Sequence, residues 1–107
     1  MHLSQELLGI IEAITSAVPV ERIYLFGSYA NGTPTTDSDY DIFLLIPDDG
    51  IKPLEAMRKA RFSLIPLNRK IPIDILADYI SRFEQRSKLN TLERIIANEG
   101  VILYERA

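Results

Sequence analysis

The sequence has no cysteine and no tryptophan, and it contains a single histidine. The lack of cysteine excludes disulfides and every metal site that depends on thiolate ligands. No apolar run approaches the ~20 residues that a helix needs to span a bilayer. The N-terminal stretch MHLSQELLGIIEAI has no basic leader and is unlike a signal peptide. We therefore expect a cytoplasmic protein with no membrane segment.

Positive charge is also scarce, with 12 lysines and arginines against 15 aspartates and glutamates, and the net charge is −3. Because a phosphate backbone attracts a net basic surface, this balance argues against a general nucleic-acid binder. The chain has 107 residues, of which 47% are hydrophobic and 25% charged. These values are ordinary for a globular protein and predict a single domain over residues 1–107.

The spacing of apolar residues, prolines and glycines predicts alternating helices and strands. Helices are expected over residues 4–17, from Pro53 to about Ile65, and from Asn90 to Gly100. Strands are expected over residues 22–26, 39–46, 70–76 and 101–104. Residues 32–38 should form a loop, and residues 78–89 are too weakly amphipathic to assign. The pattern favours an α/β (α+β) fold with a small mixed β-sheet flanked by helices, but it does not fix the strand order.

Local signals set some of the expected boundaries. Ser4 is available as the N-cap of the first helix. The segment NTLE, residues 90–93, resembles a capping box in which Glu93 reaches back to the Asn90 amide. Pro72 places the third strand at a sheet edge or delays its start, because proline has no N–H to donate to a ladder.

Two aspartates alternate at the start of the second expected strand, in the stretch DSDYDIFLL. Side chains alternate along a strand, so Asp39 and Asp41 point to the same face with Cα atoms ~6.6 Å apart. Carboxylates that converge to ~5 Å repel by ~3 kcal/mol at an effective dielectric of ~20. A divalent cation relieves this repulsion by taking oxygen ligands from both. The alternative is that both face water, and Asp37 is best interpreted as a residue of the preceding turn.

A third aspartate, Asp74, lies within the apolar stretch IPIDIL. Ionised aspartates are rarely buried without a partner. If the third expected strand lies beside the second, Asp74 joins Asp39 and Asp41 on one face. Three carboxylates from two strands can hold two metal ions ~3.5–4 Å apart. The alternative is that Asp74 faces water on an edge strand.

The pair Gly27-Ser28 ends the first expected strand, and the residues after it can begin a short helix. Glycine allows the backbone to approach a ligand closely, and the Ser28 hydroxyl adds a hydrogen-bond donor to the N–H groups of a helix start. Alone, this pair would be an ordinary strand-ending turn. Beside an acidic strand, it predicts a site for the phosphates of a nucleotide, opposite metal-binding carboxylates.

Together, these motifs resemble the nucleotidyltransferase superfamily related to DNA polymerase beta: Gly27-Ser28, then 10 intervening residues, then DYD at 39–41, and a later strand with Asp74. GSYANG and DSDYDIFLL are most similar to the minimal nucleotidyltransferases of bacteria and archaea, and the tail LERIIANEGVILYE is similar to the ends of those proteins. The resemblance covers nearly the whole chain and implies one nucleotidyltransferase domain. Asn31 departs from the pattern, because many relatives have arginine after GSYA.

The resemblance implies a role for each residue of the motif. Gly27 and Ser28 would hold the β- and γ-phosphates of ATP. Asp39 and Asp41 would bind two Mg²⁺ ions, for which Mn²⁺ is a substitute. Asp74 would bind the catalytic metal and act as general base toward the attacking hydroxyl. The implied reaction is attack on the α-phosphate of the nucleotide, with pyrophosphate as leaving group.

The resemblance also implies a partner. Minimal members are commonly encoded beside a helical HEPN-domain protein, in pairs that resemble toxin–antitoxin systems. The implied function is transfer of AMP to a tyrosine of that partner, which silences it. Two alternatives stay open: an inactive or weak nucleotide-binding module that neutralises its partner by contact, and a transferase that acts on a small molecule. The sequence leaves the acceptor, the preferred nucleotide and the state as homo- or hetero-oligomer open.

One cation stands out in the helix that begins at Pro53. On a helical wheel this helix has an apolar face, formed by Leu54, Met57, Leu64 and Ile65. Arg61 lies in the middle of that face. Either its stem is buried while its guanidinium reaches water, or it contacts the carboxylates or the triphosphate. The second interpretation makes Arg61 a candidate nucleotide-binding residue.

Overall fold

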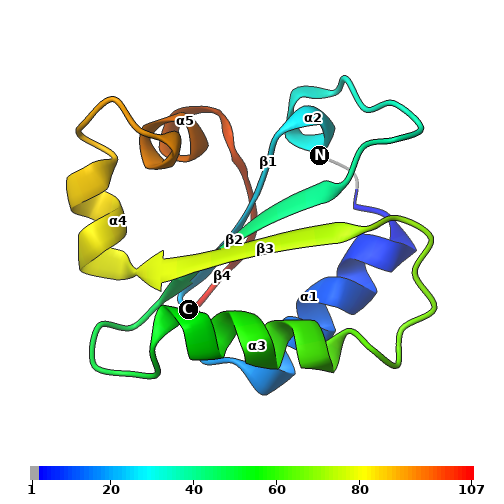
Figure 1. Cartoon of the computed structure of the whole chain (residues 1–107), viewed down its shortest axis with the longest axis horizontal. Helices are drawn as coiled ribbons and strands as arrows, with labels where there is room; N and C mark the ends of the chain where they lie inside the picture. The colour runs from blue at the N-terminus through cyan, green and yellow to red at the C-terminus, as the bar shows by residue number, and fades with distance from the viewer. Residues whose placement is uncertain (1–2) are drawn as a thin grey trace.

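Four short strands pair into one sheet in the computed structural model, which describes residues 3–107 (Figure 1). They are β1 (Arg22–Phe26), β2 (Tyr40–Ile46), β3 (Ile73–Tyr79) and β4 (Val101–Glu105). The order across the sheet is β3-β2-β1-β4. β1 is antiparallel to both of its neighbours, whereas β2 and β3 are parallel. The sheet is therefore mixed, as expected.

Helices cover both faces of this sheet. They are α1 (Gln5–Ala17), α2 (Ser28–Asn31), α3 (Pro53–Ser63), α4 (Ile80–Arg86) and α5 (Leu92–Glu99). Figure 1 shows α1 and α3 on one side and α4 and α5 on the other, with the short α2 where β1 ends. This arrangement confirms the expected α+β fold. Within residues 3–107, no helix is both long enough and apolar enough to cross a membrane.

The alternation of side chains along β2 divides the core in two. Tyr40, Ile42, Leu44 and Ile46 pack with residues of α1 and α3. Phe43 and Leu45 point the other way and pack with Phe83 of α4 and Ile96 of α5. Because both faces of the strand are covered, its sequence is a nearly continuous apolar run. Asp41 shares its face with Phe43 and Leu45, on the side of α4 and α5.

The third strand begins later than expected, at Ile73 instead of residue 70. The N–H groups of Lys70 and Ile71 donate to the Glu6 carboxylate of α1, at 3.2 and 3.3 Å, so this segment is a loop fastened to a helix. Pro72 then presents only its carbonyl, which accepts from the Tyr40 N–H at 2.9 Å. Both alternatives raised by Pro72 are correct, because β3 starts late and also forms a sheet edge.

The predicted caps were right at one helix and wrong at another. Ser4 caps α1, since its hydroxyl accepts from the Leu7 N–H at 3.1 Å. The expected capping box at residues 90–93 is wrong: Thr91 is the N-cap of α5, and its hydroxyl accepts from the Arg94 N–H. Glu93 does not reach back to Asn90, because its carboxylate binds the Arg86 guanidinium at 2.7 Å. The helix ends before Gly100, as expected.

The expected apolar face of α3 is right only in part, since Leu64 is buried and Met57 packs against the core. Leu54 and Ile65 are exposed, and the buried residues are Ala56 and Ala60 within the helix and Leu64 just after it. Small residues let a helix approach its neighbours closely, so the two alanines form the packed side although larger apolar residues are available. Leu54 and Phe62 of α3 are left facing outward.

Candidate active site

Asp41 and Asp74 are direct neighbours on adjacent parallel strands. Residues paired in this way point to the same face of a sheet, on strands ~4.8 Å apart. The expectation that the third strand lies beside the second is therefore confirmed. Asp39 immediately precedes β2 and is half-buried, like Asp41, whereas Asp74 is exposed on the edge strand. The structure thus brings Asp41 and Asp74 together at one end of the sheet, with Asp39 two residues away.

Negative charge accumulates at this end of the sheet, and none of the four ion pairs found among residues 3–107 includes Asp39, Asp41 or Asp74. Partial burial of the carboxyl raises the pKa of Asp41, and the charges of Asp74 and then Asp39 raise it further. The ionised form of Asp41 is therefore disfavoured in the folded protein. A bound cation would reverse this effect.

The chemistry of the three side chains fits a hard divalent cation. They offer only carboxylate oxygens, which suit Mg²⁺ and Mn²⁺ rather than the nitrogen- and sulfur-rich sites of zinc. In their present orientations, no three carboxylate or histidine side chains among residues 3–107 are close enough together to hold a metal ion. Asp39, Asp41 and Asp74 would hold such an ion only after turning toward one another.

Gly27 lies directly against the Asp41 carboxylate. The pairing of Phe26 with Asp41 brings the end of β1 to the start of β2. Gly27 has a φ of 76°, which is a left-handed conformation, and a Cβ placed there would collide with Asp41 Oδ2. The positive φ requires glycine, whereas the end of the Asp41 side chain would have to turn aside from a Cβ. The predicted phosphate-binding turn and the predicted metal ligand are therefore adjacent.

Ser28 begins α2, whose first turn receives no side-chain cap from the part of the chain described here. The turn itself is held by backbone hydrogen bonds, from the Asn31 N–H to the Gly27 carbonyl at 3.1 Å and from the Thr33 N–H to the Ser28 carbonyl at 2.9 Å. These contacts fix the backbone around Ser28 before any ligand binds.

Two tyrosines hold this turn against the sheet, and the sequence analysis did not identify them. The ring of Tyr29 on α2 packs on the ring of Tyr40 on β2, with centroids 4.6 Å apart. Tyr40 is buried. Since Tyr40 lies between the two acidic residues of the DYD motif, the contact couples the glycine turn to that motif. An aromatic residue on each side of the loop was the available signal.

The loop of residues 32–38 closes on its own polar groups. The Thr35 N–H donates to the Ser38 hydroxyl at 2.8 Å, and the Asp37 N–H donates to the Thr35 hydroxyl at 3.3 Å. Asp37 is exposed in this turn. These contacts agree with the interpretation of Asp37 as a turn residue.

Arg61 is exposed in the last turn of α3, away from the three aspartates. α3 packs on the side of the sheet that carries Ile42 and Leu44, whereas Asp41 points to the opposite side. The structure therefore does not bring Arg61 together with the other candidate residues.

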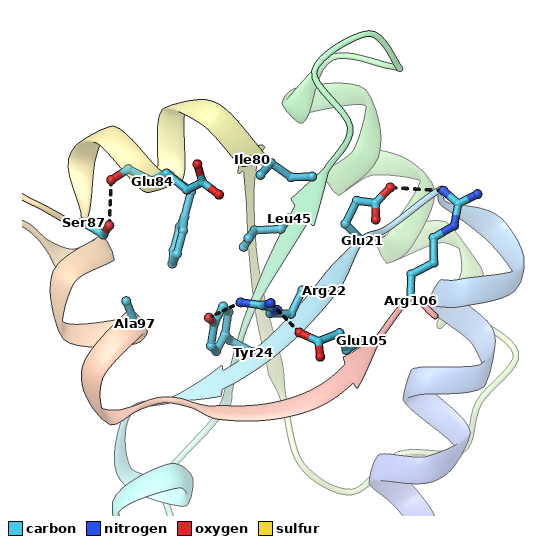
Figure 2. A pocket seen from close by; sticks show the side chains of 11 residues that line it. Glu21, Arg22, Tyr24, Leu45, Ile80, Glu84, Ser87, Ala97, Glu105 and Arg106 are labelled. Atoms are coloured by element: carbon cyan, nitrogen blue, oxygen red, sulfur yellow. Dashed lines mark hydrogen bonds and ion pairs between the residues drawn. The ribbon is translucent and has the colours of Figure 1, made fainter.

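A pocket of about 530 Å³ lies at the other end of the same sheet face (Figure 2). Tyr24 and Leu45 line it from the sheet and Phe83 from α4. Its cations are already paired: Arg22 donates to the Tyr24 hydroxyl at 2.9 Å and binds Glu105, and Arg106 binds Glu21 at 3.1 Å. The candidate residues do not line this pocket.

The comparison with protein families decides the assignment. Residues 7–103 match the family model of the nucleotidyltransferase domain. The chain belongs to this nucleotidyltransferase family. No curated protein matches its sequence.

Solved structures with the same fold agree with this assignment. The nucleotidyltransferase is similar to a toxin–antitoxin complex with AMP-PNP, at 25% identity and a TM-score of 0.59, over 96% of this chain and 75% of the other. A putative nucleotidyltransferase from Sulfolobus solfataricus has 18% identity and a TM-score of 0.62, and the match covers 94% of this chain and 79% of the other. A mutant of the toxin–antitoxin pair MntA–HpeT has 19% identity and a TM-score of 0.56, and the match covers 94% of this chain and 73% of the other.

Proposed function

We propose that this nucleotidyltransferase uses a divalent metal to transfer AMP from ATP to a hydroxyl group of a partner protein. The observation that carries the proposal is the pairing of Asp41 with Asp74, with Gly27 packed against the Asp41 carboxylate. These contacts bring the candidate metal ligands close to the candidate phosphate turn. Transfer of a nucleotidyl group needs the metal ligands and the phosphate turn at one site, because the triphosphate must be held where the acceptor can reach its α-phosphate.

Each residue has a proposed part in the reaction. Gly27 and Ser28 bind the β- and γ-phosphates. Asp39, Asp41 and Asp74 hold the metal, which when bound neutralises charge on the phosphates and the leaving group. Asp74 is also the general base. It is exposed at the sheet edge and can be reached by an acceptor hydroxyl.

The bonds that change are few. The acceptor oxygen forms a bond to the α-phosphorus, while the bond from that phosphorus to the oxygen bridging the α- and β-phosphates breaks. Asp74 takes the hydroxyl proton, and pyrophosphate leaves with the bonding electron pair. The products are the AMP ester of the acceptor and pyrophosphate, so no oxidant or further reactant is needed.

The proposed acceptor is a tyrosine of a helical HEPN-type toxin, which makes the chain an antitoxin. Two of the similar structures are toxin–antitoxin assemblies, and one of them was solved with AMP-PNP. These neighbours support an adenine nucleotide as substrate and a toxin as partner.

Incubation of the protein and its co-expressed partner with ATP labelled at the α-phosphate tests the proposal. We expect label on the partner in the presence of Mg²⁺ and none with Asp39→Asn. Asp37→Asn is the matched control, because it removes the same charge from an exposed turn. If Asp39→Asn still silences the partner and no label is transferred by the parent protein, neutralisation occurs by contact and the transferase proposal is wrong.

A further inference from the structure

The side of α3 that faces solvent carries a continuous row of large side chains. The row is Leu54, Arg58, Phe62 and Ile65, spaced by four, four and three residues. This spacing places the three residues of α3 along one line of the helix, opposite the buried Ala56 and Ala60, and Ile65 follows in the turn just after the helix. We call this row, with Arg61 beside it, the outer face of α3.

The apolar residues of the outer face are unusually exposed. Leu54 is 57% exposed, Ile65 71% and Phe62 75%. Single exposed apolar residues are normal, but three in one row indicate an interaction site. A groove of about 460 Å³ lies beside Phe62 and is lined also by Ala17 of α1, by Arg58 and Lys59, and by one acidic residue, Glu55. The aromatic ring thus projects next to a depression that a partner's side chain can fill.

Positive charge is concentrated on the same helix. Arg58, Lys59 and Arg61 are all exposed. They take part in none of the four ion pairs found among residues 3–107. In a chain with a net charge of −3, this is a local concentration of unpaired cations. Phenylalanine and arginine side by side are also the composition of protein–protein contact sites.

We propose that the outer face of α3 docks an amphipathic helix of a partner protein, with leucine-type side chains on Leu54, Phe62 and Ile65 and acidic side chains on Arg58 and Arg61. The row has the spacing by which helices pack along one another. The acidic character of the partner helix follows from charge complementarity with the unpaired cations.

Charge also decides against two other occupants. In a two-fold contact between two copies of α3, Arg58 in the row and Arg61 beside it would lie close to the same cations of the other copy and repel. An anionic membrane surface would attract α3 but repel the rest of a chain with a net charge of −3. A single acidic helix contacts α3 alone, so it meets the cations without an extended anionic surface facing the rest of the chain.

This docking surface goes beyond the proposed function and does not depend on nucleotide transfer. α3 packs on the sheet face opposite the one to which Asp41 points. A helix bound on α3 therefore leaves the aspartates open to ATP, and the two activities can be lost independently.

A hydrocarbon-stapled helical peptide with a leucine row flanked by glutamates tests the proposal, with binding to the full chain followed by fluorescence anisotropy. A version with lysines in place of the glutamates is the charge control. We expect the acidic peptide to bind and the basic one to bind at least about tenfold more weakly. Phe62→Asp and Arg58→Glu should each weaken binding about tenfold, as loss of an interface anchor does. Ile95→Asp and Lys88→Glu, which change exposed positions outside α3, should leave it unchanged.

Other results would overturn the proposal. These are equal binding of both peptides, no binding of the acidic one, or equal loss in the Ile95→Asp control. If light scattering shows that the parent protein is a dimer and that Phe62→Asp is a monomer, the face binds a second copy of the chain. Phe62-dependent binding to phosphatidylserine vesicles would assign it to membranes. If Phe62→Asp does not fold, the binding measured with Arg58→Glu decides the outcome.

Discussion

Replacing Asp41 by asparagine should stabilise the metal-free protein while removing its activity. Asp41 and Asp74 are paired on adjacent strands, and their carboxylates can lie ~5 Å apart. Two charges at that distance repel by ~0.8 kcal/mol in water and ~3 kcal/mol at an effective dielectric of ~20. Because Asp74 is exposed, the lower value is the better guide, and we expect a gain of about 1 kcal/mol in the free energy of unfolding. This corresponds to a rise in Tm of about 4 °C for a domain of this size.

The gain should depend on pH in a defined direction. Because burial and the neighbouring carboxylates raise the pKa of Asp41, the folded protein binds this proton more tightly than the unfolded chain does. That contribution to stability is complete below the ordinary aspartate pKa of ~3.9 and is lost as the pH rises through the raised value. The free energy of unfolding of Asp41→Asn should therefore equal that of the parent protein at acidic pH and be larger than it near neutral pH.

Thermal unfolding followed by circular dichroism in EDTA, at several pH values from 4 to 7.5, measures both effects. Asp37→Asn changes the net charge equally and should shift Tm by less than about 1 °C, as expected for an exposed surface site. A destabilised Asp41→Asn protein at neutral pH, or a gain that does not vary with pH, would refute the reasoning about charge at this end of the sheet.

Three further predictions follow from the site and its surroundings. Gly27→Ala should lower the free energy of unfolding by about 1–3 kcal/mol, since it forces a positive φ and a clash with Asp41; urea unfolding measures this, and an unchanged midpoint contradicts it. Arg86→Met should cost about 1–2 kcal/mol at pH 7 by leaving Glu93 without its partner. Burial raises the pKa of Glu93, but the hydrogen bond and charge of Arg86, together with hydrogen bonds from the Glu93 backbone and Thr91, outweigh it, and the net shift is downward; the loss in Arg86→Met should therefore shrink as the pH falls below ~4, and a loss that is constant with pH argues against the pair. Arg61→Met should leave the calorimetric affinity for MgATP within about twofold of the parent value, because α3 lies on the opposite sheet face; a larger loss would show that Arg61 reaches the nucleotide.

The part of the site that could be predicted from sequence is the part set by strand geometry. Period-two alternation puts Asp39 and Asp41 on the same face of the sheet. Asp41 lies beside Asp74 once β2 and β3 are neighbours in the observed register. The sequence alone did not give that neighbour relation. It depends on α3 crossing from the end of β2 back to the start of β3, which is a property of the whole fold.

The errors arose where a local signal competed with a tertiary contact. The NTLE segment favoured a capping box, but the Glu93 carboxylate binds Arg86, which comes from another helix, at 2.7 Å. The helical wheel favoured the largest apolar residues as the buried side of α3, but close packing selected Ala56 and Ala60. Ile71 continues the period-two spacing of Ile73 and Ile75, yet Glu6 of α1 accepts from the N–H groups of Lys70 and Ile71 that a strand would need.

Binding of Mn²⁺ in the presence of ATP, measured by electron paramagnetic resonance, tests the shared carboxylate site most directly. The parent protein and Asp37→Asn should both sequester the ion, and Asp74→Asn should bind it at least about tenfold more weakly, as loss of a charged ligand from a metal site does. Sequestration by Asp74→Asn equal to that of the parent would show that Asp74 does not act together with Asp39 and Asp41.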